Sequence, residues 1–184
     1  MAEYYLISQL PSLDGITENT PVPITEERFL ELCGRFLGKK ARCEMENLTL
    51  LPPLNPEKAG SALIENWNAG ERVLRLALAK ARADKRNKPL DLGNEPLPAD
   101  LMKVANDAVE IESPLEAERF LLHHRLNFLE TLRPMDNFSE DYLFYYGLKL
   151  KLILRIRQFD ATLGESEYRN IYNSILGGDK LEAL

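Results

Sequence analysis

The sequence predicts an all-α protein, a single-domain helical bundle of about five to six helices over residues 1–184. Three observations lead to this fold class. Within the long amphipathic segments, apolar residues recur at the helical spacing of about three to four residues. Residues typical of helix starts, such as Ser, Thr and Pro, precede these runs. The hydrophobic fraction of 45% and the charged fraction of 28% are ordinary for a globular domain, so we exclude a disordered chain.

The N-terminal part contains one clear helix signal. Residues 4–10 are too few to distinguish a short extended segment from a helical turn, and residues 12–23 contain the Pro, Gly and Asn of a loop. Thr25 is a suitable N-cap for a helix that Gly38 ends. Residues 48–54 are apolar but include two prolines, so we expect a buried connector rather than a strand.

The first long helix is expected to open at Asn55 and Pro56, a cap followed by a residue suited to the first helical position. Trp67 lies within the apolar stripe of this helix, which favours a core role over a binding hot spot. Gly70 in the same stripe costs about 1 kcal/mol relative to Ala, so we expect a neighbouring helix to approach closely there. Residues 88–98 form a loop or hinge. The stripe consists of Leu63, Trp67, Gly70, Leu74, Ala77, Leu78 and Ala81.

The second half of the chain predicts further helices. Residues 98–109 suit a short one. Ser113 caps the next, which runs toward Arg133 and stops before a proline. Ser139 caps a helix that is apolar on so wide an arc that we expect it at the centre of the bundle. Residues 165–176 predict a last helix, which two glycines end.

The cysteines and histidines do not form a pattern typical of a metal site. Cys33 and Cys43 are too far apart for a CxxC motif and no close His completes a zinc set, so we interpret both as thiols in a reducing compartment. His123 and His124 point about 100° apart on a helix and cannot bind one metal in the usual i, i+4 way. We favour one packed and one solvated histidine over a pH-sensing or metal-binding role.

The carboxylates and glycines favour a non-catalytic protein. Most of the abundant carboxylates stand at or just before helix starts, where they suit the helix dipole. A small helical enzyme that uses buried carboxylates is the weaker alternative, because a catalytic pair needs environments that separate two pKa values. Neither a glycine-rich phosphate loop nor a nucleophile elbow is present in the sequence. We therefore expect no catalytic residue and no cofactor.

Net charge and hydropathy bear on partners and location. The formal net charge of −6 and the pI near 5.1 argue against a nucleic-acid-binding protein. The N-terminus lacks the basic and apolar regions of a signal peptide. Lys149, Lys151 and Arg155 interrupt the most apolar segment, residues 142–156, which is too short and too charged to span a bilayer. We expect a cytoplasmic protein, either free or peripheral on a membrane complex.

A basic run over residues 80–88 is the most pronounced charge feature. It is typical of a solvated helix end, where cations complement the helix dipole. The sharper interpretation is a docking patch for an acidic partner surface. A second basic row on an otherwise apolar helix either covers apolar surface at the bundle edge or faces a partner. The candidate partner-binding residues of the two rows are Arg82, Lys85, Arg86, Lys151 and Arg155.

Six groups of short motifs, spread in order over nearly the whole chain, share a common pattern. They are residues 4–11, residues 27–32, Asn66-Trp67 with Leu74-Arg75 and residues 81–83, residues 114–118, residues 127–129 and residues 145–150. Together they resemble an uncharacterised bacterial family encoded alongside V-type (rotary) ATPases. The order and spacing of the motifs carry this resemblance. The chain departs from the pattern at Leu76, which follows Arg75 where an Arg-Asn pair is expected.

That family is distantly similar to the C-type subunit of V/A-type ATPases, whose eukaryotic counterpart is the d-type subunit. This type of subunit is an all-helical funnel that couples the central rotor shaft to the membrane ring. The resemblance implies a non-catalytic connector in a proton- or sodium-translocating ATPase, with rotor-shaft and membrane-ring subunits as partners. An ATPase assembly factor or regulatory adaptor that binds only transiently is the alternative within the same resemblance.

Overall fold

The computed structural model describes residues 2–16, 20–53, 60–90, 95–158, 166 and 168–173, and this part of the chain contains helices and no strand. The all-α fold class is therefore confirmed. The labelled helices are α1 (Ala2–Gln9), α2 (Glu26–Phe36), α3 (Lys39–Glu46), α4 (Ala62–Lys85), α5 (Ala99–Glu110), α6 (Pro114–Thr131) and α7 (Glu140–Arg157). Residues 168–173 are also helical, so the expected number of five to six helices is too low.

The extra helices lie in the N-terminal part. Residues 4–10, left open between an extended segment and a helical turn, fall mostly within α1. Gly38 does stand just after α2, but it is also the N-cap of α3, a helix that the sequence did not predict. Its backbone is extended, with φ −64° and ψ 157°, which interrupts the helical path. Only Leu37 and Gly38 separate the end of α2 from the start of α3. A single glycine thus serves a stop and a start.

Side-chain caps begin the predicted helices at α2, α6 and α7. The Arg28 backbone N–H donates to Thr25 Oγ1 at 3.2 Å, and the Tyr142 N–H donates to Ser139 Oγ at 3.2 Å. Ser113 accepts in the same way from the third residue after it. The three predicted caps are therefore confirmed. Each accepts from a backbone N–H only three residues away, so the local sequence was enough to predict it.

The predicted start of α4 is wrong. Asn55 and Pro56 lie outside the described residues, and Gly60 and Ser61 are not helical. Ser61 is the N-cap instead, accepting from the Ile64 N–H at 3.4 Å. The Ser61 hydroxyl also donates to Asp141 Oδ1 at 2.6 Å. This hydrogen bond ties the start of α4 to the start of α7, which a local sequence signal does not reveal.

The predicted connectors are partly borne out. Leu48 is buried but Leu51 is 55% exposed, so only part of the connector over residues 48–53 is buried. Residues 88–90 and 95–98 lack regular secondary structure, as a loop requires, and residues 91–94 lie outside the description. Of the last predicted helix, only residues 166 and 168–173 are described. Within the described residues, no helix combines the length and apolar character needed to cross a membrane.

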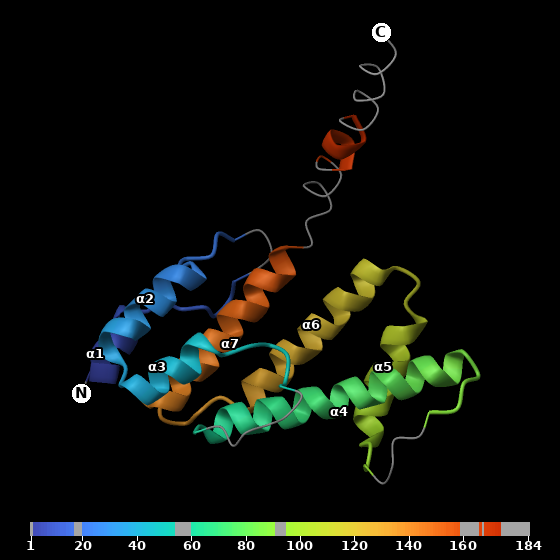
Figure 1. Ribbon diagram of the computed structural model, residues 1–184, viewed down its shortest axis with the longest axis horizontal. Coiled ribbons are helices and arrows are strands. Elements are labelled where there is room, and N and C mark those ends of the chain that lie inside the picture. Colours follow the sequence, from blue (N-terminus) through green and yellow to red (C-terminus); the bar gives the residue numbers. More distant parts are fainter. Residues whose placement is uncertain are drawn as a thin grey trace.

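Helix α7 lies at the centre of the larger of two hydrophobic cores, as its wide apolar arc predicts (Figure 1). All residues from 143 to 150 are buried. We call this larger set the large core; it also takes side chains from α1, α2, α3, the first half of α4 and the second half of α6. Trp67 belongs to it and is fully buried, which confirms the predicted core role.

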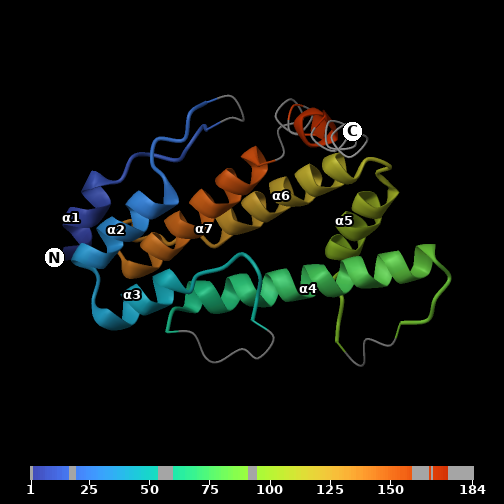
Figure 2. The ribbon, with the colours of Figure 1, turned by 45° about the horizontal axis from the view of Figure 1, so that its top comes forward.

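A second set of buried residues, the small core, joins the far half of α4 to α5 and the first half of α6 (Figure 2). It consists of Leu74, Ala77, Leu78, Ala81, Ala105, Ala108 and Leu121. Between the two cores, the Phe128 ring of α6 occupies the place where a side chain at Gly70 would lie. Helix α6 therefore reaches Gly70 with a large side chain and not with its backbone, so the close helix approach predicted from Gly70 is wrong.

Candidate functional site

A groove runs between α4 and α6 along the edge of the small core. It is formed by two adjoining hollows of about 490 and 470 Å³, which share Leu78, Arg82, Glu118 and Leu121 as lining residues. We call the two hollows together the basic groove. Hollows of this size are typical of binding sites in proteins. The apolar part of the lining comes from Leu50, Leu51, Leu78, Ala108, Val109, Pro114, Ala117, Leu121 and Leu122.

The charged lining of the basic groove is strongly biased toward cations. Six cationic side chains line it, against the two carboxylates of Glu71 and Glu118. The whole chain carries a formal charge of −6, so this surface opposes the charge of the rest of the molecule. A hollow with one sign of charge attracts groups of the opposite sign. The cationic side chains are those of Arg75, Arg82, Lys85, Arg86, Arg125 and Arg155.

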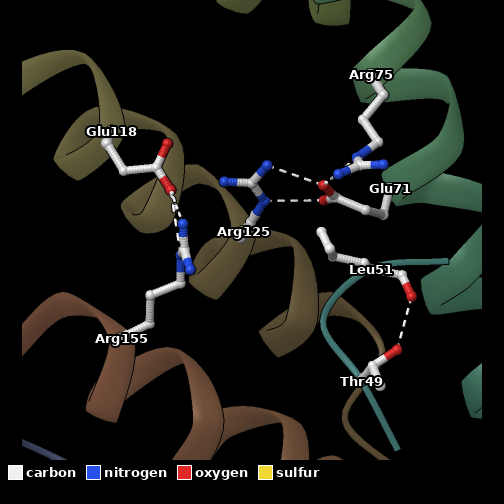
Figure 3. Close-up of polar contacts among 7 residues, drawn as sticks. All are labelled: Thr49, Leu51, Glu71, Arg75, Glu118, Arg125 and Arg155. Atoms are coloured by element: carbon white, nitrogen blue, oxygen red, sulfur yellow. Dashed lines mark hydrogen bonds and ion pairs between the residues drawn. The ribbon is translucent and has the colours of Figure 1, made fainter. Parts of the chain in front are cut away.

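The inner wall of the groove contains a buried ion pair between α4 and α6. Arg125 donates through Nε and Nη2 to the two carboxylate oxygens of Glu71, at 2.9 and 2.8 Å (Figure 3). The side chains are 13% and 2% exposed, respectively. Burial alone lowers the pKa of Arg125, but the hydrogen bonds and the charge of Glu71 outweigh it, so the pKa is raised. Arg75 lies 3.5 Å from the same carboxylate.

A second pair lies across the groove, between α6 and α7. Arg155 donates to Glu118 Oε1 through Nη2 at 3.1 Å and through Nε at 3.3 Å (Figure 3). Arg155 was predicted as a partner contact from its place in a basic row. The structure puts it in the groove wall, beside the hollow that Arg82 also lines. The Arg155 side chain remains 47% exposed, so the pair is open to solvent.

The predicted basic run of α4 divides into two kinds of residue. Lys85 donates from Nζ to the Val109 carbonyl at 2.5 Å, so it holds the end of α4 to the end of α5. Arg82 and Arg86 are exposed, and neither forms an ion pair within the described residues. Arg82 lines both hollows. Its charge and that of Arg86 are therefore available to a partner.

Lys151 does not join the other four predicted residues. It lies on α7 and forms an ion pair with Glu26, in the first turn of α2. Neither hollow of the groove includes it. The structure thus brings Arg82, Lys85, Arg86 and Arg155 together and places Lys151 at the packing edge between α2 and α7.

Four charged groove residues escaped the sequence prediction: Glu71, Arg75, Glu118 and Arg125. Glu71 carried a usable signal, because it falls four residues after Trp67 and three before Leu74, in phase with the apolar stripe of α4. A carboxylate in that phase is buried and needs a cationic partner. The sequence does not identify the partner, since Arg125 is 54 residues away.

The described residues show little that is typical of catalysis. Within them, no group of three or more His, Cys, Asp or Glu side chains is placed to hold a metal ion. His123 is exposed and His124 is half-buried, which confirms one solvated and one packed histidine. Burial, followed by the charge of Arg125, lowers the pKa of His124. Burial also raises the pKa of Cys33 to about 12, so its thiol is not a nucleophile at neutral pH.

A second polar cluster ties the N-terminal segment to α7. Lys149 is buried and lies 2.6 Å from Asp14 and 2.7 Å from Glu130. Tyr145 donates to Glu130 at 2.7 Å, and Tyr146 donates to the Pro11 carbonyl at 2.9 Å. Burial lowers the pKa of Lys149, but its own hydrogen bonds to Asp14, Glu130 and Tyr145 outweigh burial, so the pKa is raised. The cluster therefore holds a paired charge and fastens a loop.

Comparison of the chain with protein-family models, curated proteins and solved structures gives no match. The basic groove is the feature that best combines shape, charge and open access.

Proposed function

We propose that this chain is a non-catalytic connector of a V/A-type rotary ATPase, and that the basic groove docks an acidic surface of a partner protein in that complex. Two independent observations support the proposal. The order of sequence motifs resembles a family encoded alongside such ATPases, whose distant relative links the rotor shaft to the membrane ring. The groove supplies a surface suited to docking, and it carries the argument.

The form of the groove suits a protein partner. Its floor is apolar, with Leu78 and Leu121 at the junction of the two hollows, while cations lie around it. Protein interfaces commonly combine an apolar centre with a polar rim, and arginine is enriched in them. Arg82 at this junction forms no ion pair within the described residues, so an incoming carboxylate need not displace one.

The state of the two groove carboxylates supports docking over acid–base chemistry. Glu71 is held by two hydrogen bonds from Arg125, and Glu118 is held by Arg155. An enzyme that uses buried carboxylates needs one of them to exchange a proton near neutral pH. Both groove carboxylates are instead engaged by arginine donors.

The test is to co-express the tagged chain with the ATPase subunits of its own organism and to measure what co-purifies near physiological salt. Arg82→Glu with Arg86→Glu reverses the two unpaired charges of the groove. We expect the double variant to fold and to recover the other ATPase subunits at least about tenfold less well, because rim charges become repulsive. Lys39→Glu with Lys103→Glu is the matched control, since both residues are exposed and lie outside the groove and the basic run.

The outcomes separate the hypotheses. Equal recovery by wild type and the Arg82/Arg86 variant would remove the groove from the proposal. Recovery at fixed stoichiometry with rotor-shaft and membrane-ring subunits supports a permanent connector. Substoichiometric recovery that is lost on washing supports the alternative, an assembly factor or regulatory adaptor. Recovery of nothing from an assembled, active ATPase would contradict both.

A further inference from the structure

Helix α1 and the turn between α6 and α7 lie at one end of the molecule, away from the C-terminal end of α4 (Figure 1). Both segments carry exposed apolar side chains. Tyr4 and Tyr5 of α1 are 59% and 55% exposed. Met135 and Phe138, in the turn between α6 and α7, are fully exposed and 47% exposed. The Tyr4 and Phe138 rings stack with their centroids 4.5 Å apart, so the two segments form one surface. Large apolar groups that share a surface commonly mark an interaction site.

This surface is held in place by local bonds. The Phe138 backbone N–H donates to Asp136 Oδ1 at 2.9 Å, and the Ser139 hydroxyl donates to the Asp136 carbonyl at 2.8 Å. Ser139 also caps α7, so the turn is fixed to the central helix. Tyr5 packs against Phe36 of α2, with ring centroids 5.4 Å apart. The aromatic side chains are therefore preorganised, which lowers the entropic cost of binding.

Carboxylates flank the same rings. Glu3 directly precedes Tyr4 in α1, and the exposed carboxylates of Asp136 and Glu140 lie two residues before and two residues after Phe138. Burial, followed by the charge of Glu3, raises the pKa of Glu140, so the two acidic segments lie near each other. The segments that carry the exposed aromatic rings therefore also carry negative charge.

We propose that this acidic aromatic end, defined by Tyr4, Tyr5, Met135 and Phe138 with Glu3 and Glu140, is a second docking surface. Its occupant is a partner protein segment that presents lysine or arginine beside apolar side chains, as a basic amphipathic helix does. Charge complementarity selects this occupant. A second copy of the chain docked end to end would instead bring like charges together.

The acidic aromatic end adds to the basic groove a surface of opposite charge, around α1 and the turn between α6 and α7 instead of along α4. A chain with both surfaces is able to hold one acidic and one basic partner at the same time, which a single groove does not permit.

The test uses the full chain and a fluorescein-labelled amphipathic peptide built of leucine and lysine, with binding measured by fluorescence anisotropy. We expect wild type to bind, and more tightly as salt is lowered. Tyr4→Ser with Phe138→Ser removes the stacked rings, and Glu3→Gln with Glu140→Gln removes two charges. Each pair should weaken binding by at least about tenfold.

Matched controls separate this surface from general attraction to an acidic protein. Tyr168→Ser with Tyr172→Ser removes two other exposed rings, and Glu65→Gln with Glu112→Gln removes two other exposed charges. These variants should bind within about twofold of wild type, as should the groove variant Arg82→Glu with Arg86→Glu. Circular dichroism of every variant checks the fold.

Two outcomes would overturn the proposal. One is a wild-type chain that does not bind the peptide, or end variants that bind as the controls do. The other is a wild-type dimer in sedimentation that the Tyr4/Phe138 variant dissociates, because the occupant would then be a second copy. If the chain co-purifies with no ATPase subunit but still binds the peptide, only the proposed function is contradicted.

Discussion

The two cores of this protein are built from different side chains. The large core is filled by leucines and aromatic rings, among them Trp67, Phe29 and Phe144, and it surrounds α7. The small core has seven buried residues, four of them alanines. Alanine allows helices to lie close together but buries little apolar area, and each buried methylene contributes about 0.8 kcal/mol. We infer that the large core supplies most of the stability.

The difference matters because the basic groove follows the small core. Leu78, Ala108 and Leu121 belong to the small core and also line the groove. A surface for binding is commonly drawn from the less stable part of a fold, where adjustment costs less. The large core then serves as the rigid support on which this part is mounted.

The sharpest comparison of the cores is truncation of one buried residue in each. Phe144→Ala in the large core should lower the free energy of unfolding by about 3–5 kcal/mol, because the fully buried ring leaves a cavity. Leu121→Ala, beside the open groove, should cost about 2 kcal/mol, since its surroundings can relax. Urea unfolding measures both. Equal losses would contradict the ranking of the two cores.

The boundary between the cores is tested at the buried ion pair. Glu71→Gln should lower the free energy of unfolding by about 3 kcal/mol, because Arg125 then carries a buried charge without its partner. Glu71→Leu combined with Arg125→Met should recover much of this loss, since an apolar pair removes both charges. A double variant whose loss equals the sum of the losses of Glu71→Leu and Arg125→Met, each made singly, would show that the two residues are not coupled.

The smallest expected effect is a dependence of stability on pH near the small core. The pKa of His124 is lowered in the fold by burial and by the charge of Arg125. A lowered pKa means that the folded state favours the neutral imidazole. The contribution of His124 to the free energy of unfolding is therefore fully present above the unfolded pKa of roughly 6.5. It is lost as the pH falls toward the folded pKa.

The free energy of unfolding of wild type should therefore decrease between about pH 7.5 and pH 5.5, and His124→Gln should reduce that slope. His123→Gln is the control, because His123 is exposed. Urea midpoints at the two pH values make the comparison. A slope that His124→Gln leaves unchanged would assign the effect to other groups.

Local signals predicted those parts of the fold that local contacts determine. Thr25, Ser113 and Ser139 each bind a donor three residues away, so their positions are readable from the sequence. The start of α4 was predicted at Asn55, but the structure caps this helix at Ser61. The hydrogen bond from Ser61 to Asp141, 80 residues away, accompanies the cap that the structure uses.

The candidate site shows the same division. The unpaired charges of Arg82 and Arg86 follow from composition, because they belong to a basic run at a helix end. The roles of Lys151 and Arg125 do not follow from it. Lys151 pairs with Glu26 on α2, and Arg125 pairs with Glu71 on α4, so each role depends on a helix distant in sequence.

Helix α4 has a mechanical consequence. Its 24 residues give a rod about 36 Å long, which runs from the start of α7, beside the acidic aromatic end, to the groove cations (Figure 2). The large core holds one half of this rod and the small core holds the other. A force applied at Arg86 is therefore transmitted along one continuous series of backbone hydrogen bonds. Helix α4 can pass a displacement from one of its ends to the other as a rigid rod, because no loop interrupts it.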